Sequence, residues 1–156
     1  MLAQGIDHFH TCDSEFNLPA EHAREVCRAI IDAGLADRIR WYAYCAPKPF
    51  DDELAALFQR AGCAGINFGV DSGCDEMLRR LGRHFRTEDL ASTAQSCRRH
   101  GIPFMFDLLL GGPGETRETL RQTIEFMRRI EPDCVGLAIG MRVYEGTPMA
   151  KWVRTE

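Results

Sequence analysis

Lysine is almost absent from this 156-residue chain: Lys48 and Lys151 are the only two, so arginine supplies most of the positive charge. With a formal net charge of −4, the composition argues against a general nucleic-acid or membrane surface. No apolar run reaches the roughly 18 residues of a membrane-spanning helix, and His8 and His10 interrupt any signal-peptide core. We therefore expect a cytoplasmic protein without a membrane or nucleic-acid partner.

Closely spaced cysteines are absent too. The seven cysteines stand at positions 12, 27, 45, 63, 74, 97 and 134, so no C-x-x-C or C-x-x-x-C-x-x-C occurs. This spacing excludes zinc ribbons, thioredoxin motifs and local iron–sulfur loops, and no metal ligand is assigned. Most of these cysteines lie inside strand or helix patterns, where a thiol acts as a small buried hydrophobe.

Low-complexity stretches and linkers are also missing, so we predict a single domain over residues 1–156. Its apolar residues alternate between strand-like and helix-like periods. The predicted strands cover residues 5–12, 39–45, 63–70, 102–110 and 133–143. The predicted helices cover residues 19–33, 51–61, 75–81, 87–100, 116–130 and a last, unfinished one from 148. Such a βα repeat implies an α/β fold with a parallel sheet and right-handed crossovers.

Two geometries fit this repeat: a flat doubly wound sheet, or part of a βα barrel. About five βα units are too few to close an eight-stranded barrel, so an open parallel arc is the better prediction. Polar residues and glycines follow the predicted strands. The segments before the strands contain only residues that end the preceding helices, such as Gly34 and Gly62. This one-sidedness suggests that a ligand lies along the carboxyl edge of the sheet.

The stretch Gly111-Gly112-Pro113-Gly114-Glu115 follows the fourth strand and precedes a helix. Glycines at the end of a parallel strand let a ligand approach bare backbone, and the next helix start offers free amides. A tight strand-to-helix turn without a ligand is the alternative for this stretch alone.

Five motifs occur in series along the chain: Asp13-Ser14-Glu15-Phe16-Asn17, then Phe68 to Gly73 after Ala61-Gly62-Cys63, then Leu78 to Arg83, then Leu110 to Thr116, and last Tyr144 to Pro148. In this order and at about this spacing, the set resembles the radical S-adenosylmethionine (radical SAM) superfamily. It is most similar to the branch that includes cobalamin-dependent methylases and anaerobic porphyrin-ring cyclases. Each motif is weak singly, and five in series are specific.

The resemblance implies an open parallel βα arc, part of a (βα)6 partial TIM barrel, to which this chain contributes the second to sixth strands. In the family, the first strand precedes a C-x-x-x-C-x-x-C loop that holds a 4Fe-4S cluster. The open iron of that cluster binds S-adenosylmethionine for radical chemistry. Since the sequence begins after that segment, we expect a radical SAM core fragment that is inactive by itself. Its partners would be a small-molecule substrate and the missing N-terminal half or another subunit, with cobalamin supplied by a separate domain.

The resemblance also assigns cofactor-binding residues, although no catalytic residue. Asp71 and Ser72 would face the ribose or methionine part of the cofactor, unless they only cap the next helix. Residues 111–115 would run alongside the adenine and offer it backbone groups. Tyr144 would stack near the adenine or pack at the rim. Asp13 and Asn17 would look toward the substrate or the cofactor amine. Arg83 or Arg79 would neutralise the cofactor carboxylate, or be an exposed helix-face arginine.

Three alternatives stay open. His8 and His10 share one face of a strand, as in metal-dependent barrel hydrolases, and would need acidic residues as further zinc ligands. Residues 111–116 could form a phosphate cradle, although the P-loop and dinucleotide spacings are missing. The third alternative is a non-catalytic remnant or a subunit that must dock onto a partner, because an unpaired second strand favours association.

Overall fold

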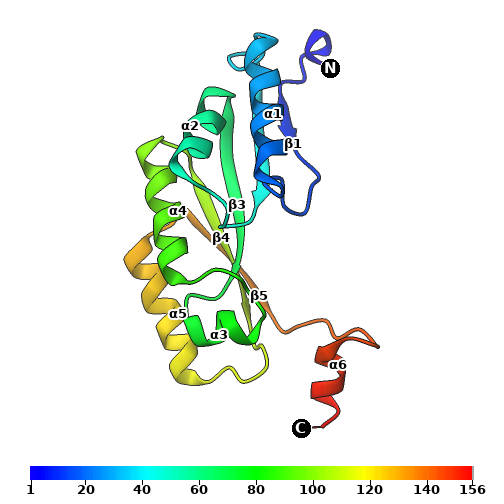
Figure 1. Cartoon of the computed structure of the whole chain (residues 1–156), viewed down its shortest axis with the longest axis vertical. Coiled ribbons are helices and arrows are strands. Elements are labelled where there is room, and N and C mark those ends of the chain that lie inside the picture. Colours follow the sequence, from blue (N-terminus) through cyan, green and yellow to red (C-terminus); the bar gives the residue numbers. More distant parts are fainter. Residues whose placement is uncertain (156) are drawn as a thin grey trace.

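A computed structural model describes residues 1–155, and Figure 1 shows how its elements are arranged. The strands are β1 (His8–His10), β2 (Arg40–Cys45), β3 (Cys63–Asp71), β4 (Phe104–Leu110) and β5 (Cys134–Ile139). The helices are α1 (Ala20–Asp32), α2 (Asp52–Arg60), α3 (Asp75–Arg80), α4 (Thr87–Arg99), α5 (Arg117–Ile130) and α6 (Pro148–Val153), preceded by a 3-10 turn at Leu2–Gln4. No helix among residues 1–155 is long and apolar enough to cross a bilayer.

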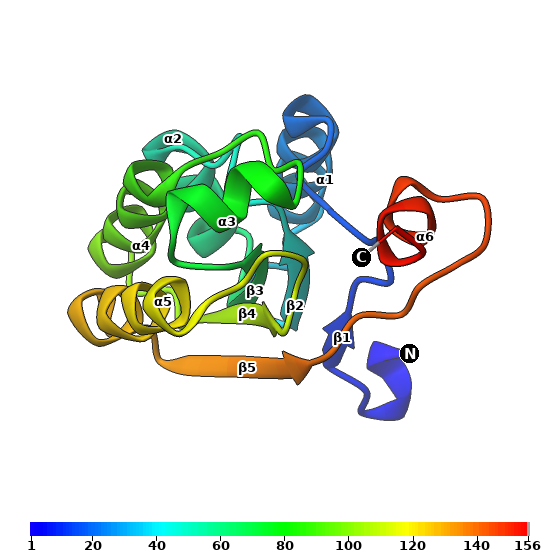
Figure 2. The same ribbon diagram turned by 90° about the horizontal axis from the view of Figure 1, so that it is seen from below.

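The five strands form one sheet in the order β1-β2-β3-β4-β5, and every neighbouring pair is parallel. The sheet curves into a half-barrel, with α1, α2, α4 and α5 on its outer side (Figure 2). The predicted open arc is therefore confirmed. The doubly wound geometry is wrong, because the strand order never reverses across the sheet.

Alternating residues of the strands divide the sheet into a covered face and an open one. On β2, Trp41, Ala43 and Cys45 are buried against the helices, whereas the residues between them are exposed. The same period places Phe68 of β3 and Phe106 of β4 in the core. Their rings lie 6.0 Å apart in an edge-to-face arrangement, which favours aromatic packing.

Two strands are shorter than the sequence predicts. β1 covers only His8–His10, and β5 ends at Ile139 instead of continuing to residue 143. At Gly140 the backbone turns with φ +84°, a conformation that ends a strand. The chain then leaves the sheet and reaches α6, which projects beyond the carboxyl edge (Figure 1).

Candidate functional site

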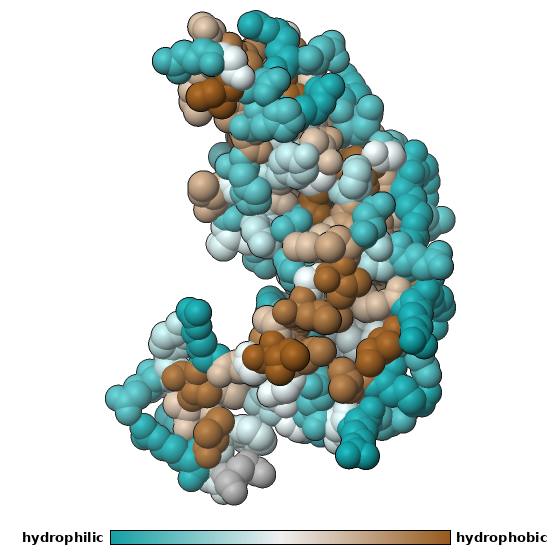
Figure 3. All heavy atoms as spheres, turned by 180° about the vertical axis from the view of Figure 1, so that it is seen from behind, coloured by the Kyte–Doolittle hydropathy of each residue, from teal (hydrophilic) through white to brown (hydrophobic). Residues whose placement is uncertain are grey.

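The open face of the sheet is concave (Figure 3), and the strand register orders its side chains in rows. One row runs Tyr44–Asn67–Met105 across β2, β3 and β4. The next row toward the carboxyl edge runs Gly69–Asp107–Gly136 across β3, β4 and β5. Apolar side chains gather in the lower half of this face, toward β5 and α6 (Figure 3).

Asp107 stands between two glycines in its row; its carboxylate lies over Gly136, and the sheet beside it is open at Gly69. A side chain on Gly136 would place its Cβ 1.9 Å from Oδ1 of Asp107, whereas one on Gly69 would meet nothing within 4 Å. Burial and then the charge of Asp71 raise the pKa of Asp107, and no hydrogen bond offsets this effect. The result is a half-buried acceptor beside bare backbone.

Asp71 is fixed at the carboxyl end of β3. A bulge interrupts the β3–β4 register between Gly69 and Asp71, and Asp71 has a φ of 61°. Left-handed backbone is uncommon outside glycine and marks a constrained position. Nε of Arg83 donates to Oδ2 of Asp71 at 2.5 Å, so an arginine already neutralises this carboxylate. Of the two arginines that the sequence proposes, Arg83 therefore lies at the site, while Arg79 bonds the carbonyl of Asp75 on its own helix.

Ser72 turns away from the open face. It is 1% exposed, its hydroxyl lies 2.9 Å from that of Thr123, and it accepts from the Cys74 amide at 3.1 Å. The structure thus places this side chain in the core, where its hydroxyl contacts α5 and the residue before α3, and a direct cofactor contact by Ser72 has no geometric support. Asn17 is likewise buried, since its side chain bonds Ala46 and Pro49 and joins two loops.

The glycine stretch forms a closed turn with an apolar pocket above it. The Gly111 amide donates to Oε2 of Glu115 at 2.5 Å, and the Glu115 amide donates to the Gly112 carbonyl at 3.0 Å. The pocket has a volume of about 260 Å³ and is lined by the glycine stretch and by Met141, Val143, Met149, Trp152 and Val153. The sequence did not identify these apolar residues, because they follow β5 without a recognisable period.

The expected convergence of Asp71, Ser72, the glycine stretch and Tyr144 on one cleft is not what the structure has. Tyr144 is 64% exposed and does not line the glycine pocket, which α6 residues close instead. Pro113 and Gly114 do line it, and Gly114 also lies against the guanidinium of Arg80. Asp13 is exposed in the β1–α1 loop, apart from this pocket.

The histidine pair gives the hydrolase alternative no support. Nδ1 of His8 contacts Asp7 at 2.7 Å, and Nδ1 of His10 contacts the Thr11 carbonyl at 2.5 Å. Among residues 1–155 no group of three His, Cys, Asp or Glu side chains is arranged to hold a metal ion. The two imidazoles lie on the open face at its β1 edge, in register with Arg40 and Tyr42.

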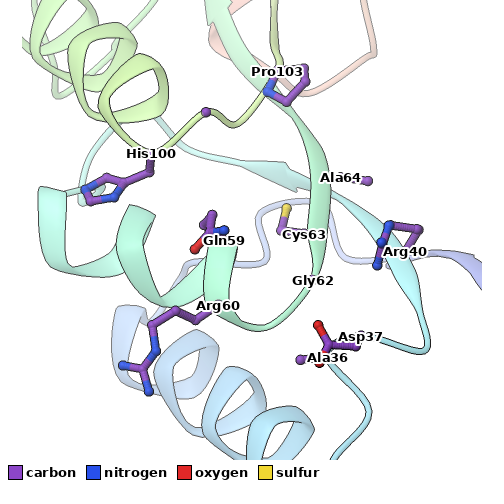
Figure 4. A pocket seen from close by; sticks show the side chains of 11 residues that line it. Ala36, Asp37, Arg40, Gln59, Arg60, Gly62, Cys63, Ala64, His100 and Pro103 are labelled. Carbon is purple, nitrogen blue, oxygen red and sulfur yellow. The ribbon is translucent and has the colours of Figure 1, made fainter.

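A larger cavity, with a volume of about 530 Å³, lies at the opposite, amino end of the sheet (Figure 4). Gln59 and Cys63 point toward its middle, while Arg60 extends away from it (Figure 4). Helix ends and turns form its walls, as at Ala36 and Gly101. In βα barrels this end serves stability, and ligands bind at the carboxyl end.

The cysteines do not fit an iron–sulfur cluster. Burial raises the pKa of Cys27, Cys63 and Cys97 to about 12, and it raises the pKa of Cys45 as well. Cluster ligands are thiolates, which these environments disfavour. Among residues 1–155, no three cysteines are grouped to hold a metal ion.

A parallel half-barrel with carboxylates and open glycines at its carboxyl edge belongs to the class of ligand-binding βα barrels. Comparison with known proteins narrows this class: the profile of the Radical SAM superfamily matches residues 1–127, so the chain belongs to that superfamily. It is 37% identical to tryptophan 2-C-methyltransferase of Streptomyces laurentii over 97% of this chain and 27% of that protein.

Solved structures agree. A radical SAM methyltransferase, TsrM from Kitasatospora setae with tryptophan substrate and a SAM analogue bound, superposes with a TM-score of 0.89. It is 36% identical over 99% of this chain and 31% of that one. The cobalamin-dependent radical SAM enzyme OxsB shares the fold, with a TM-score of 0.68 at 16% identity over 96% of this chain and 23% of that one. The chain thus spans about a third or less of each of these three proteins.

Proposed function

We propose that this chain is the S-adenosylmethionine-binding part of a cobalamin-dependent radical SAM methyltransferase. The observation that carries the proposal is the row Gly69–Asp107–Gly136, where an unbonded carboxylate stands between two glycines. A sugar or amine can lie on bare backbone there and donate hydrogen bonds to a charged acceptor, which are the stronger kind. The similarity to methyltransferases supports methyl transfer as the activity of the whole protein.

Different residues at the carboxyl edge bind different parts of the cofactor. Asp107 accepts hydrogen bonds from the ribose hydroxyls, and Asp71 accepts from a hydroxyl or from the ammonium group. Arg83, paired with Asp71, lies where it can also neutralise the cofactor carboxylate. The glycine stretch and its apolar pocket hold the adenine, because a flat ring fits over bare backbone and against Met141 and Trp152. Bound S-adenosylmethionine supplies the methyl group or a carbon radical.

The iron–sulfur cluster is assigned to residues outside this set, since the described cysteines do not fit it. A segment or subunit that brings three closely spaced cysteines is therefore the partner that the activity requires, and cobalamin belongs to a further domain. All seven cysteines are free thiols, which supports a reducing compartment such as the cytoplasm.

Isothermal titration calorimetry with S-adenosylhomocysteine tests this assignment on the 156-residue chain. We expect saturable binding that Asp107→Leu abolishes, because the acceptor is removed while the slot stays filled. Glu118→Gln on the exposed face of α5 is the control and should bind like the wild type. Binding that is absent from the folded wild type, or unchanged in Asp107→Leu, would contradict the proposal.

A further inference from the structure

The outer face of β5 is apolar and largely uncovered. Val135 and Leu137 pair in register with Phe106 and Leu108 of β4, so all four lie on the helix-covered side of the sheet. The β4 residues are 0% and 5% exposed, whereas Val135, Leu137 and Ile139 are 36%, 62% and 84% exposed. The next helix, α6, projects beyond the carboxyl edge instead of returning over the strand (Figure 1). An apolar strip along β5 is therefore open to solvent.

The free edge of β5 also leaves backbone groups without a strand partner. Among residues 1–155, β5 pairs with β4 alone, and its other edge forms the rim of the sheet (Figure 2). The Gly140 amide donates to the Leu110 carbonyl at 2.8 Å, so every second amide back along β5 points toward β4. The backbone groups of Val135, Leu137 and Ile139 consequently point away from β4. Such a row is a template for another strand.

The two edges of the sheet differ in how well they resist such pairing. β1 has three residues, of which two are histidines, and it follows Asp7, whose carboxylate contacts His8. β5 has six residues without a charge or a proline, and it pairs with β4 in an unbroken register. Short edges and charged side chains protect a strand from association, whereas a longer apolar edge favours it. We therefore expect β5, and not β1, to bind a further strand.

We propose that β5 pairs antiparallel with β5 of a second copy of this chain, across a two-fold axis at Leu137. In this register Leu137 faces Leu137 of the second copy, and Val135 faces its Ile139. These are the residues whose backbone groups point outward, so each pair exchanges two hydrogen bonds. The antiparallel direction also brings Asp133, before the strand, near Arg142 of the second copy, after it. Apolar side chains and opposite charges both match, which favours a second copy over an unrelated strand.

This contact closes at two copies. A two-fold contact uses the same edge of both chains, so neither copy keeps a free β5 edge, and only the short, polar β1 edges remain. On the open face, β5 contributes the small residues Gly136 and Ala138, which do not obstruct the pairing. The inference goes beyond the proposed function and does not depend on it.

Sedimentation equilibrium of the 156-residue chain under reducing conditions tests the inference. We expect twice the mass of one chain, with a return to one mass on dilution. Leu137→Lys should be a monomer at every concentration at which the wild type is a dimer, because two like charges then meet at the axis. Ile6→Lys, at a residue that is 45% exposed before β1, is the matched control and should remain a dimer.

Leu137→Cys gives a second readout that does not require a charged variant to fold. Paired residues on the axis have Cα atoms about 5.5 Å apart, within the range of a disulfide. Mild oxidation should therefore link two Leu137→Cys chains through position 137, as peptide mass spectrometry would show. The wild type is the control, since its exposed Cys134 faces Gly140 of the second copy. A wild type that stays monomeric, a dimer that persists in folded Leu137→Lys, or a dimer without the 137–137 link would overturn the inference.

Discussion

Glycines at the two ends of the sheet serve opposite purposes. At the amino end, Gly62 has a φ of +84°, and a Cβ there would lie 2.4 Å from the carbonyl oxygen of Ala36. Toward the carboxyl end, Gly69 has nothing within 4 Å of the position where its Cβ would be. The first glycine lets two backbone segments pack, and the second leaves space beside a carboxylate.

This difference locates the function better than cavity volume does. The amino end has the larger cavity, about 530 Å³, yet it is lined by the ends of helices. The carboxyl end has the smaller pocket, about 260 Å³, together with the unbonded Asp107 and the constrained backbone of Asp71. Substitutions at the amino end should therefore cost stability, whereas those at the carboxyl end should cost binding.

The largest effect should come from Gly62→Ala. The new methyl group meets a backbone oxygen that cannot move freely, and alanine is strained at positive φ, so we expect about 2–4 kcal/mol of destabilisation. Urea unfolding measures it. Gly5→Ala is the matched control, because Gly5 has a φ of +78° but open space around it, and it should lose only the smaller, conformational part. Equal losses of unfolding free energy in the two variants would show that Gly62 is not needed for the packing of the two backbone segments.

Gly69→Val should have the opposite effect: it should weaken ligand binding and leave the stability of the fold nearly unchanged. The position is extended strand with open space, so urea unfolding should change little, while valine fills the floor beside Asp107. We expect the binding of S-adenosylhomocysteine to weaken by about 2–3 kcal/mol, as when methyl groups are forced into an occupied space. Calorimetry checks the affinity. A variant that binds normally would show that the ligand does not lie on this part of β3.

Asp71→Asn should weaken the same binding by about 1–2 kcal/mol, because a charged acceptor becomes neutral and Arg83 loses its ion pair. Asparagine tolerates left-handed backbone, so the fold should persist. The circular dichroism spectrum checks the fold, and calorimetry checks the affinity. An affinity equal to that of the wild type would leave Asp71 as a turn residue only.

The smallest effect is the pH dependence of Asp107. Its raised pKa means that the folded state holds the proton more tightly than the unfolded chain, whose aspartates ionise near pH 4. This contribution to stability is present below that pH and is lost as the pH rises through the raised pKa. Asp107→Asn avoids the loss, so it should have a higher melting temperature than the wild type at pH 7.5. The difference should shrink below about pH 4, and a pH-independent difference would contradict the assignment.

The fold follows from the sequence because a parallel strand with one covered face alternates strictly, as Trp41, Ala43 and Cys45 do. The helices end where glycines or polar residues end their periods, so most bounds agree within one or two residues. The exceptions are β1 and β5, the two edge strands of the sheet. An edge strand is paired on one side only, so the alternating sequence pattern there extends beyond the residues that form strand hydrogen bonds.

The site was less predictable, because the direction of a side chain depends on local backbone angles. The alternation of apolar and polar residues in the sequence does not specify these angles. The bulge and the φ of 61° at Asp71 turn Ser72 into the core. Tyr144 lies in an extended loop after Gly140, where no period sets its direction. Asp107 was missed although a signal existed: it is a single carboxylate in the otherwise apolar stretch 102–110.

The most direct test compares the two ends in one experiment, by nuclear magnetic resonance of backbone amides during titration with S-adenosylhomocysteine. The account predicts shifts at residues 69–72, 107–108, 111–114 and 136–141, which form the carboxyl edge. It predicts none at residues 36–40, 59–64 and 100–103, which line the amino-end cavity. Shifts confined to the amino-end residues, or no shifts at saturating ligand, would contradict the cofactor site proposed for this chain.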